Sequence, residues 1–124
     1  MVLDKYLKQT DFKSYEEFKS GLEITIPERF NFAYDVVDEI AQTSPDKTAM
    51  VWCDDKGNEA VFTFGQMKYF SDKAANFFLS KGIRKGDPVM LILKRHYTFW
   101  FCTLALNKIG AVTIPQLIFS PQKT

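Results

Sequence analysis

The stretch KGDPVMLILKRHYTFWFCTLALNKIGAVTIP, residues 85–115, decides the fold class of this chain. Its apolar run at 89–93 is typical of a strand buried on both faces, and residues 97–109 carry a helical pattern that Gly110 ends. The apolar segment 111–114 follows as a second strand. A strand, a helix and a strand of this length form a right-handed crossover. The two strands are therefore predicted to be parallel neighbours in one sheet.

The loop Lys94-Arg95-His96 lies at the expected carboxyl end of the first of these strands. Open parallel sheets bind ligands at that edge, and the start of the following helix favours anions. Lys94, Arg95 and His96 are therefore candidate cofactor-binding residues. The alternative is a solvated basic loop, because the sequence places no orienting acid beside His96. We assign no catalytic residue and no metal ligand.

Residues 31–43 predict an amphipathic helix before this stretch. Apolar side chains recur there at helical spacing, and Asn31 is a plausible N-cap. The carboxylates of Asp35, Asp38 and Glu39 are then expected on the polar side of the helix, rather than as an acid–base pair.

In residues 47–64 the spacing of apolar residues changes to the two-residue period of β-strands, which predicts a β-hairpin. KTAMVWC and EAVFTF are predicted strands around a turn that Asp54, Asp55 and Gly57 favour. The first strand is apolar on both faces, so both of its faces are expected to be covered.

A long helix is predicted next. Thr63 and Gln66 have the spacing of a capping box, and Gly82 is expected to end the helix in the left-handed conformation. Gly82 and Gly86 do not indicate a phosphate-binding loop. Such a loop leads from a strand into a helix, and here the order is reversed.

The composition is that of an ordinary soluble globular protein. Of the 124 residues, 46% are hydrophobic and 12 are Phe, so a core can form without disulfides or metals. Sixteen Lys and Arg against fifteen Asp and Glu leave a net charge of +1, which predicts no nucleic-acid partner. Cys53 and Cys102 are expected to be unpaired thiols, and with a single His they supply no zinc site.

The N-terminal segment MVLDKYLKQTDFKSYEEF carries acidic residues and no apolar core. It therefore differs from a secretory signal and from an Arg-rich transit peptide. No apolar run approaches the ~18 residues of a membrane span. The sequence favours a cytoplasmic protein without a membrane span.

Two stretches resemble a known family. FNFAYDVVDEIAQTSPDKTAMVW, followed by FTFGQMKYFSDKAANFFLSKGIRKGDPVMLILKRHYTFWFCTLALNKIGAVTIP, is similar to the N-terminal region of AMP-forming acyl-CoA synthetases of the adenylate-forming superfamily. The shared pattern is a helix, GI-KGD, an apolar strand, a loop, a helix and a Gly-Ala-Val strand ending in Pro. FNFAYDVVD and LKRHYTFW resemble the medium-chain branch. The resemblance covers roughly residues 15–115, and none of its motifs is catalytic.

The resemblance implies a two-step reaction. In the family a carboxylic acid, here expected to be a fatty acid, attacks ATP to give an acyl-adenylate, and CoA then displaces AMP. The family's Ser/Thr/Gly-rich loop with Lys, its ribose-holding Asp and its C-terminal Lys have no counterpart here, where every Gly is isolated. ATP, Mg²⁺ and CoA are therefore expected only for a longer parent enzyme, and this chain alone is expected to be inactive. The final stretch QLIFSPQKT departs from the family pattern, as expected of a truncated chain.

The predicted fold is α/β, an N-terminal fragment of the adenylate-forming enzyme fold with a β-hairpin and a parallel βαβ unit flanked by helices. Residues 1–26 are expected to be a peripheral leader, and residues 27–124 a partial N-terminal AMP-binding domain. The alternative is a free-standing α/β binding or interaction module without catalysis. Helix 97–109 is apolar on two faces, and one small sheet covers only one of them. We therefore expect self-association through Phe99, Trp100 or neighbouring residues, or an exposed apolar patch larger than monomers usually carry.

Overall fold

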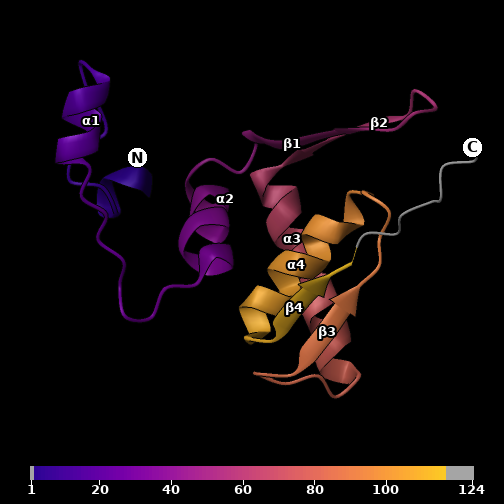
Figure 1. The fold of residues 1–124 in the computed structure, drawn as a ribbon. Helices are drawn as coiled ribbons and strands as arrows, with labels where there is room; N and C mark the ends of the chain where they lie inside the picture. Colours follow the sequence, from indigo (N-terminus) through magenta and orange to yellow (C-terminus); the bar gives the residue numbers. More distant parts are fainter. Residues whose placement is uncertain (1, 117–124) are drawn as a thin grey trace, which may run out of the picture. The chain divides into compact units, whose positions relative to one another are not determined.

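The computed structural model describes residues 2–116, and the chain divides into two compact units, Met1–Phe30 and Asn31–Thr124 (Figure 1). None of the described helices is long and apolar enough to cross a membrane. The final stretch after Gln116 lies outside the described residues.

The first unit is small and consists of a 3-10 helix, η1 (Val2–Lys5), and a short helix, α1 (Tyr15–Gly21). Ser14 caps α1 by accepting a hydrogen bond from the Glu17 N–H at 3.2 Å. The chain before and after α1 meets in a single antiparallel bridge between Leu7 and Ile24.

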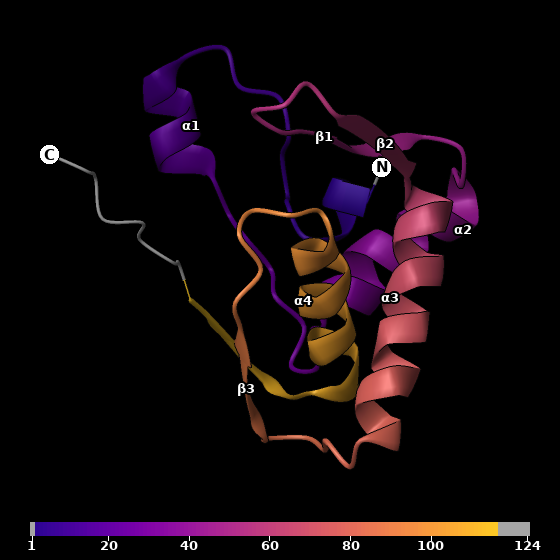
Figure 2. The ribbon, with the colours of Figure 1, turned by 90° about the vertical axis from the view of Figure 1, so that its right-hand side faces the viewer.

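The second unit carries the α/β fold. Its layers are the β3–β4 sheet, α4 and α3, with α4 lying between the other two (Figures 1 and 2). The predicted α/β class with a hairpin and a parallel sheet is confirmed. The elements are η2 (Ala33–Asp38), α2 (Glu39–Thr43), β1 (Thr48–Cys53), β2 (Glu59–Thr63), α3 (Phe64–Ser80), β3 (Pro88–Leu91), α4 (Thr98–Ile109) and β4 (Val112–Pro115).

The β3–β4 sheet is parallel, as the crossover predicts, with Val89 opposite Thr113 and Met90 opposite Ile114. The prediction that β3 is buried on both faces is wrong. Leu91 is buried, whereas Met90 and Val112 are about half exposed. A sheet of two strands has α4 on one face, and no other described element packs on the opposite face.

The hairpin pairs β1 with β2 in an antiparallel register that sets Trp52 opposite Ala60. Its turn follows the predicted chemistry. Gly57 has φ +81°, and the Asp54 carboxylate accepts two hydrogen bonds from Asn58. The expected cover on both faces of β1 is wrong, because Val51, on the face opposite Trp52, is 68% exposed.

The long helix α3 begins and ends where its sequence signals place it. The Thr63 hydroxyl accepts from the Gln66 N–H, and the Gln66 side chain accepts from the Thr63 N–H, which completes the capping box. Gly82 follows the helix with φ +89°. Gly86 then forms the turn into β3, so both glycines serve the helix end and the turn, as predicted.

The helix predicted at 31–43 has a different winding over its first half. Ala33–Asp38 form a π-helix, and the α-helical part covers only Glu39–Thr43. Asn31 accepts from the Ala33 N–H at 3.0 Å and thus begins the segment as expected. The placement of Asp38 on the polar side is wrong, because Asp38 is 4% exposed. A π-helix bonds residues five apart and therefore stacks Asp38 above the buried Ala33.

The core of the second unit joins η2, α3 and α4. Its main cluster consists of Ala33, Val37, Met67, Phe101 and Leu104, with aromatic rings of the hairpin and of Tyr97 packed against it. Phe101 stacks on Phe70 with 4.9 Å between ring centroids. The hairpin and the loop before α4 are thereby held against one aromatic core.

Candidate functional site

The loop between β3 and α4 is held against the hairpin. The indole Nε1–H of Trp52 donates a hydrogen bond of 2.9 Å to the carbonyl oxygen of Arg95. The Trp52 ring also lies 5.3 Å from the His96 ring and 5.2 Å from the Tyr97 ring, centroid to centroid. The loop therefore has a fixed path, although β3 ends at Leu91, earlier than the predicted end at residue 93.

Arg95 has a left-handed backbone, with φ +54°. It is the single residue other than glycine with positive φ among the described residues. This conformation costs an L-residue roughly 1 kcal/mol or more. The contacts of Trp52 and the rings beside it offset that cost.

The His96 ring caps the first turn of α4. Its Nδ1 accepts a hydrogen bond from the Thr98 N–H at 3.3 Å, and the Thr98 hydroxyl lies 3.0 Å from the same nitrogen. Because Nδ1 accepts, the proton of the neutral ring is assigned to Nε2. Within residues 2–116, no hydrogen bond occupies Nε2 of His96 or the ammonium of Lys94.

An open hollow of about 820 Å³ lies between the hairpin and this loop. It brings two of the three predicted cofactor-binding residues together, Lys94 and His96. Arg95 is not part of its wall. The hollow is lined by Trp52, Asp54, Asp55, Lys56, Asn58, Glu59, Ala60, Lys94, His96 and Tyr97.

The charge of this hollow is mixed. Its wall carries three carboxylates against two ammonium groups. One carboxylate, that of Asp54, is occupied by the turn, and its hydrogen bonds with the Asn58 side chain and N–H hold its pKa below the usual range. The hollow offers aromatic faces and single charges of both signs, without an excess of positive charge for a polyphosphate.

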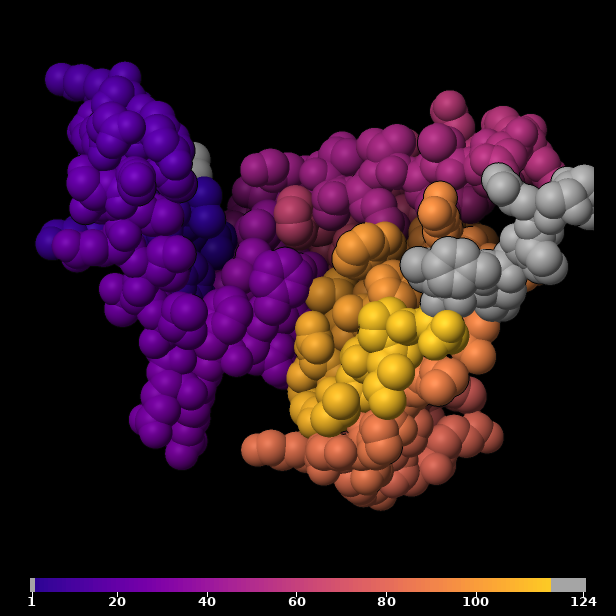
Figure 3. All heavy atoms as spheres, viewed as in Figure 1, coloured from indigo at the N-terminus to yellow at the C-terminus, as the bar shows by residue number. Residues whose placement is uncertain are grey.

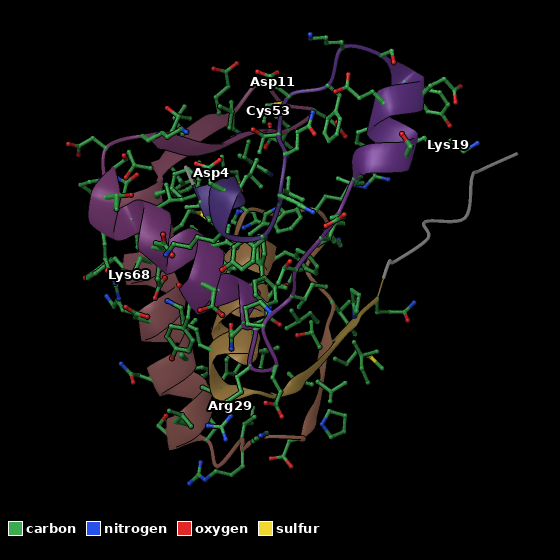
Figure 4. All side chains as sticks on the ribbon, turned by 90° about the vertical axis from the view of Figure 1, so that its left-hand side faces the viewer. Asp4, Asp11, Lys19, Arg29, Cys53 and Lys68 are labelled. Carbon is green, nitrogen blue, oxygen red and sulfur yellow. The ribbon has the colours of Figure 1, made fainter. Side chains whose placement is uncertain are left out.

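A second polar arrangement was missed by sequence reasoning. The Lys108 ammonium, on a side chain that is 1% exposed, lies 2.8 Å from Asp38 Oδ1 and 2.6 Å from Asp72 Oδ1. Lys68, labelled in Figure 4, bridges the same two carboxylates from α3, at 2.5 Å to Asp72 and 3.7 Å to Asp38. We call these four residues the charge ring. The sequence signal for it is the spacing of four residues between Lys68 and Asp72 on α3.

The charge ring shifts the titration of its members. Burial alone would raise the pKa of Asp72, but hydrogen bonds from Lys108 and Lys68 outweigh it and hold the pKa below its usual value. The Asp72 carboxylate in turn raises the pKa of Lys68. Within the described part of the chain, no group of three or more His, Cys, Asp or Glu side chains is arranged to hold a metal ion.

The comparisons with known proteins all point to one family. The family model for the AMP-binding enzyme matches residues 37–121, which is more than half of the chain. The match runs past Pro115, so it includes part of the stretch QLIFSPQKT, which was expected to depart from the family pattern.

Curated relatives include the mitochondrial acyl-coenzyme A synthetase ACSM3 of Rattus norvegicus, 35% identical over 121 residues. That match covers 91% of this chain and 20% of the relative. The crotonobetaine/carnitine–CoA ligase of Proteus mirabilis is 37% identical over 78 residues, covering 63% of this chain and 15% of the relative. The chain thus spans about a fifth of the length of its closer-matching curated relatives.

Solved structures share the fold. The N-terminal subdomain of Klebsiella oxytoca NpsA matches with a TM-score of 0.62 and 30% identity, covering 71% of this chain and 22% of that one. A fatty acid AMP ligase from Legionella pneumophila matches with a TM-score of 0.67 at 20% identity, covering 81% of this chain and 18% of that one. The second likeness is evidence for the fold alone.

Proposed function

Because the chain belongs to the AMP-binding enzyme family, we propose that it forms the N-terminal part of an acid–CoA ligase. The longer enzyme activates a carboxylic acid, most simply a fatty acid, with ATP and Mg²⁺ and transfers the acyl group to CoA. The observation that carries this proposal is the 35% identity to an acyl-coenzyme A synthetase over nearly the whole chain. The partner is a small-molecule acid and not a nucleic acid, in keeping with a net charge of +1.

The chain alone is proposed to lack acyl-adenylating activity. Its sequence contains no Ser/Thr/Gly-rich loop with a Lys to stabilise the charge that develops on the α-phosphate. ATP–pyrophosphate exchange with a series of fatty acids tests this. We expect no exchange above a protein-free blank, and exchange that persists after repurification would contradict the proposal.

The DNA downstream of codon 124 separates this function from a free-standing binding module. We expect a continuation, in frame or shifted, that encodes a Ser/Thr/Gly-rich loop with Lys. A downstream sequence without one would favour the module.

We also propose that residues 27–124 are part of the AMP-binding domain, which is supported by the family match from residue 37. Residues 1–26 are proposed to be a peripheral leader.

Lys94, Arg95 and His96 are the proposed cofactor-contacting residues. The support is their position between β3 and α4 and the free Nε2 of His96 beside the hollow. Titration of the chain with ATP and, separately, with CoA should shift the His96 ring signals and leave those of Tyr34 unchanged. Equal shifts of the His96 and Tyr34 ring signals, or no shift of either, would contradict a cofactor-binding role for this loop.

Self-association through exposed apolar surface is also proposed. Trp100 is 53% exposed on α4, and Met90 and Val112 are exposed on the sheet face away from α4. Atoms of β4 are at the surface in Figure 3. Sedimentation at several concentrations tests this, and we expect the weight-average mass to rise with concentration. A monomer at every concentration would contradict it.

The proposed location is the cytoplasm, because residues 1–20 carry four acidic side chains and no apolar core. The relatives named above include mitochondrial enzymes. Fluorescence imaging of the chain carrying a C-terminal tag distinguishes the two compartments, and mitochondrial signal would contradict this part of the proposal.

A further inference from the structure

The outer side of α3 repeats one pair of side chains. Tyr69 is followed four residues later by Lys73, and Phe77 is followed four residues later by Lys81. The Lys73 ammonium lies 5.1 Å from the centre of the Tyr69 ring, and the Lys81 ammonium lies 5.5 Å from the centre of the Phe77 ring. At 3.6 residues per turn the four positions lie within about 120° of the helix circumference. We call these four residues the aromatic–lysine stripe.

The rings of the aromatic–lysine stripe face solvent. Tyr69 and Phe77 are each 56% exposed, and the buried residues of α3 lie on its other side. Leu79 is 40% exposed, so the last turn of the helix carries two exposed apolar side chains. An isolated exposed apolar residue is common, whereas a group of them indicates a surface that binds something.

Positive charge continues beyond the end of the helix. Arg84 and Lys85 follow in the loop 81–87, and both are exposed. This loop and the last turn of α3 lie at the same end of the second unit (Figures 1 and 2). The Arg84 guanidinium donates hydrogen bonds to the Leu79 and Ile83 carbonyl oxygens, which holds the cation beside the exposed apolar side chains.

The acidic residues of this region already have partners. Asp72 is the single acid in the sequence of α3, and its carboxylate is bound within the charge ring. The Asp87 carboxylate accepts a hydrogen bond from the Arg84 N–H at 2.7 Å. Residues 73–87 carry four Lys and Arg against this one Asp, although the whole chain has a net charge of only +1. The end of α3 is therefore a local positive patch with apolar side chains in it.

We propose that the aromatic–lysine stripe and the loop 81–87 bind the surface of a membrane that contains anionic lipids. The Lys and Arg side chains contact the anionic headgroups, and Phe77 and Leu79 enter the boundary between headgroups and acyl chains. The pairing of each ring with a lysine suits this boundary. A lysine stem lies along apolar surface while its ammonium stays in the headgroup layer.

A lipid surface fits this patch better than an acidic protein does. The stripe follows the outer, convex side of a helix, and acyl chains accept exposed apolar side chains without a matching pocket. An acidic protein would pair with the cations but would need a pocket for Phe77. The proposal does not depend on the ligase proposal, because its residues all belong to α3 and the loop after it.

Flotation of the full chain with vesicles tests the role of charge. We expect binding to phosphatidylcholine vesicles that contain about 30% phosphatidylserine, and binding at least about tenfold weaker without phosphatidylserine. Lys73→Gln with Lys81→Gln should weaken binding by about tenfold or more, because each cation near an anionic surface contributes about fivefold. Lys13→Gln with Lys19→Gln is the matched control, which removes the same charge from the first unit. Equal weakening by the two pairs would overturn the proposal.

Phe77→Ser tests the apolar contact separately. We expect binding about tenfold weaker with an unchanged circular dichroism spectrum, because the ring is exposed. Tyr15→Ser is the matched control, since Tyr15 is 69% exposed in the first unit, and its binding should stay within about twofold of the unchanged chain. Binding to vesicles that does not depend on Phe77 would overturn the proposal.

A fluorescent variant distinguishes a lipid surface from a soluble acidic partner. Phe77→Trp, combined with Trp52→Phe and Trp100→Phe, leaves one indole at the proposed contact. We expect its emission to shift to shorter wavelength with the phosphatidylserine vesicles and to stay unchanged with polyglutamate, which offers carboxylates without acyl chains. An equal shift with polyglutamate, or no shift with vesicles, would contradict insertion of this side chain and with it the proposal.

Discussion

The indole of Trp52 and the carbonyl oxygen of Arg95 are joined by a hydrogen bond of 2.9 Å across 43 positions of the chain. This bond connects the β1–β2 hairpin to the loop that carries Lys94 and His96. Arg95 is also the residue with φ +54°. The hairpin thus supports the loop where its backbone is strained.

Trp52→Phe should lower the free energy of unfolding by about 1 kcal/mol, because the Arg95 carbonyl loses its donor while an aromatic ring remains. Urea denaturation of the full chain measures this. Trp100→Phe is the matched control, since Trp100 is 53% exposed and donates no hydrogen bond to a described residue. Equal losses in the two variants would show that the indole volume matters and the bond does not.

Arg95→Gly should leave stability unchanged or raise it by a few tenths to about 1 kcal/mol, because glycine adopts positive φ without strain. Lys94→Gly, at the neighbouring exposed position, should lower it by about 0.5–1 kcal/mol through backbone entropy alone. Thermal melts of both variants give the comparison. If Arg95→Gly lowers the stability as much as Lys94→Gly does, the Arg95 side chain itself holds the loop.

Thr63→Ala should cost about 1 kcal/mol, since it removes the acceptor for the Gln66 N–H at the start of α3. Thr43→Ala is the control, because the Thr43 hydroxyl donates to carbonyls within its own helix and does not cap its start. We expect that control to stay within about 0.5 kcal/mol of the unchanged chain. Circular dichroism followed in urea reports both.

The regular elements were predictable because their signals are local. The Thr63–Gln66 capping box, Gly82 after α3 and Gly110 after α4 each require contact only between near neighbours in the sequence. The parallel pairing of β3 with β4 followed from the length of the helix between them. For these elements, local chemistry and the tertiary fold favour the same conformation.

The predictions that were wrong also have a physical explanation. Asp38 was placed by a period of 3.6 residues, and the π-winding of η2 turns it inward to meet Lys108, 70 positions away. The exposed Met90 and Val51 lie on strands whose apolar pattern predicts cover on both faces, and one face of each lacks a described partner. At the loop, the sequence placed Lys94 and His96 together but gave no sign that Trp52 fixes them, since that contact comes from a distant hairpin.

Acid should weaken the fold through Asp72. Its folded-state pKa lies below the unfolded value of 3.8, because Lys108 and Lys68 outweigh the effect of burial. The contribution to stability is therefore fully present above the unfolded pKa and is lost as the pH falls through the folded pKa. Asp72→Asn should flatten the acid side of a plot of unfolding free energy against pH. Asp55→Asn, in the exposed turn, should leave the acid slope in place, and identical slopes for all three chains would exclude the charge ring as the cause.

The two thiols should differ in reactivity. Cys53, labelled in Figure 4, is exposed on the hairpin, whereas burial raises the pKa of the half-buried Cys102 on α4. Thiolate is the reactive form, so iodoacetamide at pH 8 should modify Cys53 first and Cys102 at least about tenfold more slowly. Mass spectrometry of peptides at timed intervals resolves the two sites, and Cys102→Ser supplies the rate of Cys53 alone. In urea the two rates should converge, because unfolding removes the burial that raises the pKa of Cys102. Slow modification of Cys102 that persists in urea would contradict burial as the cause.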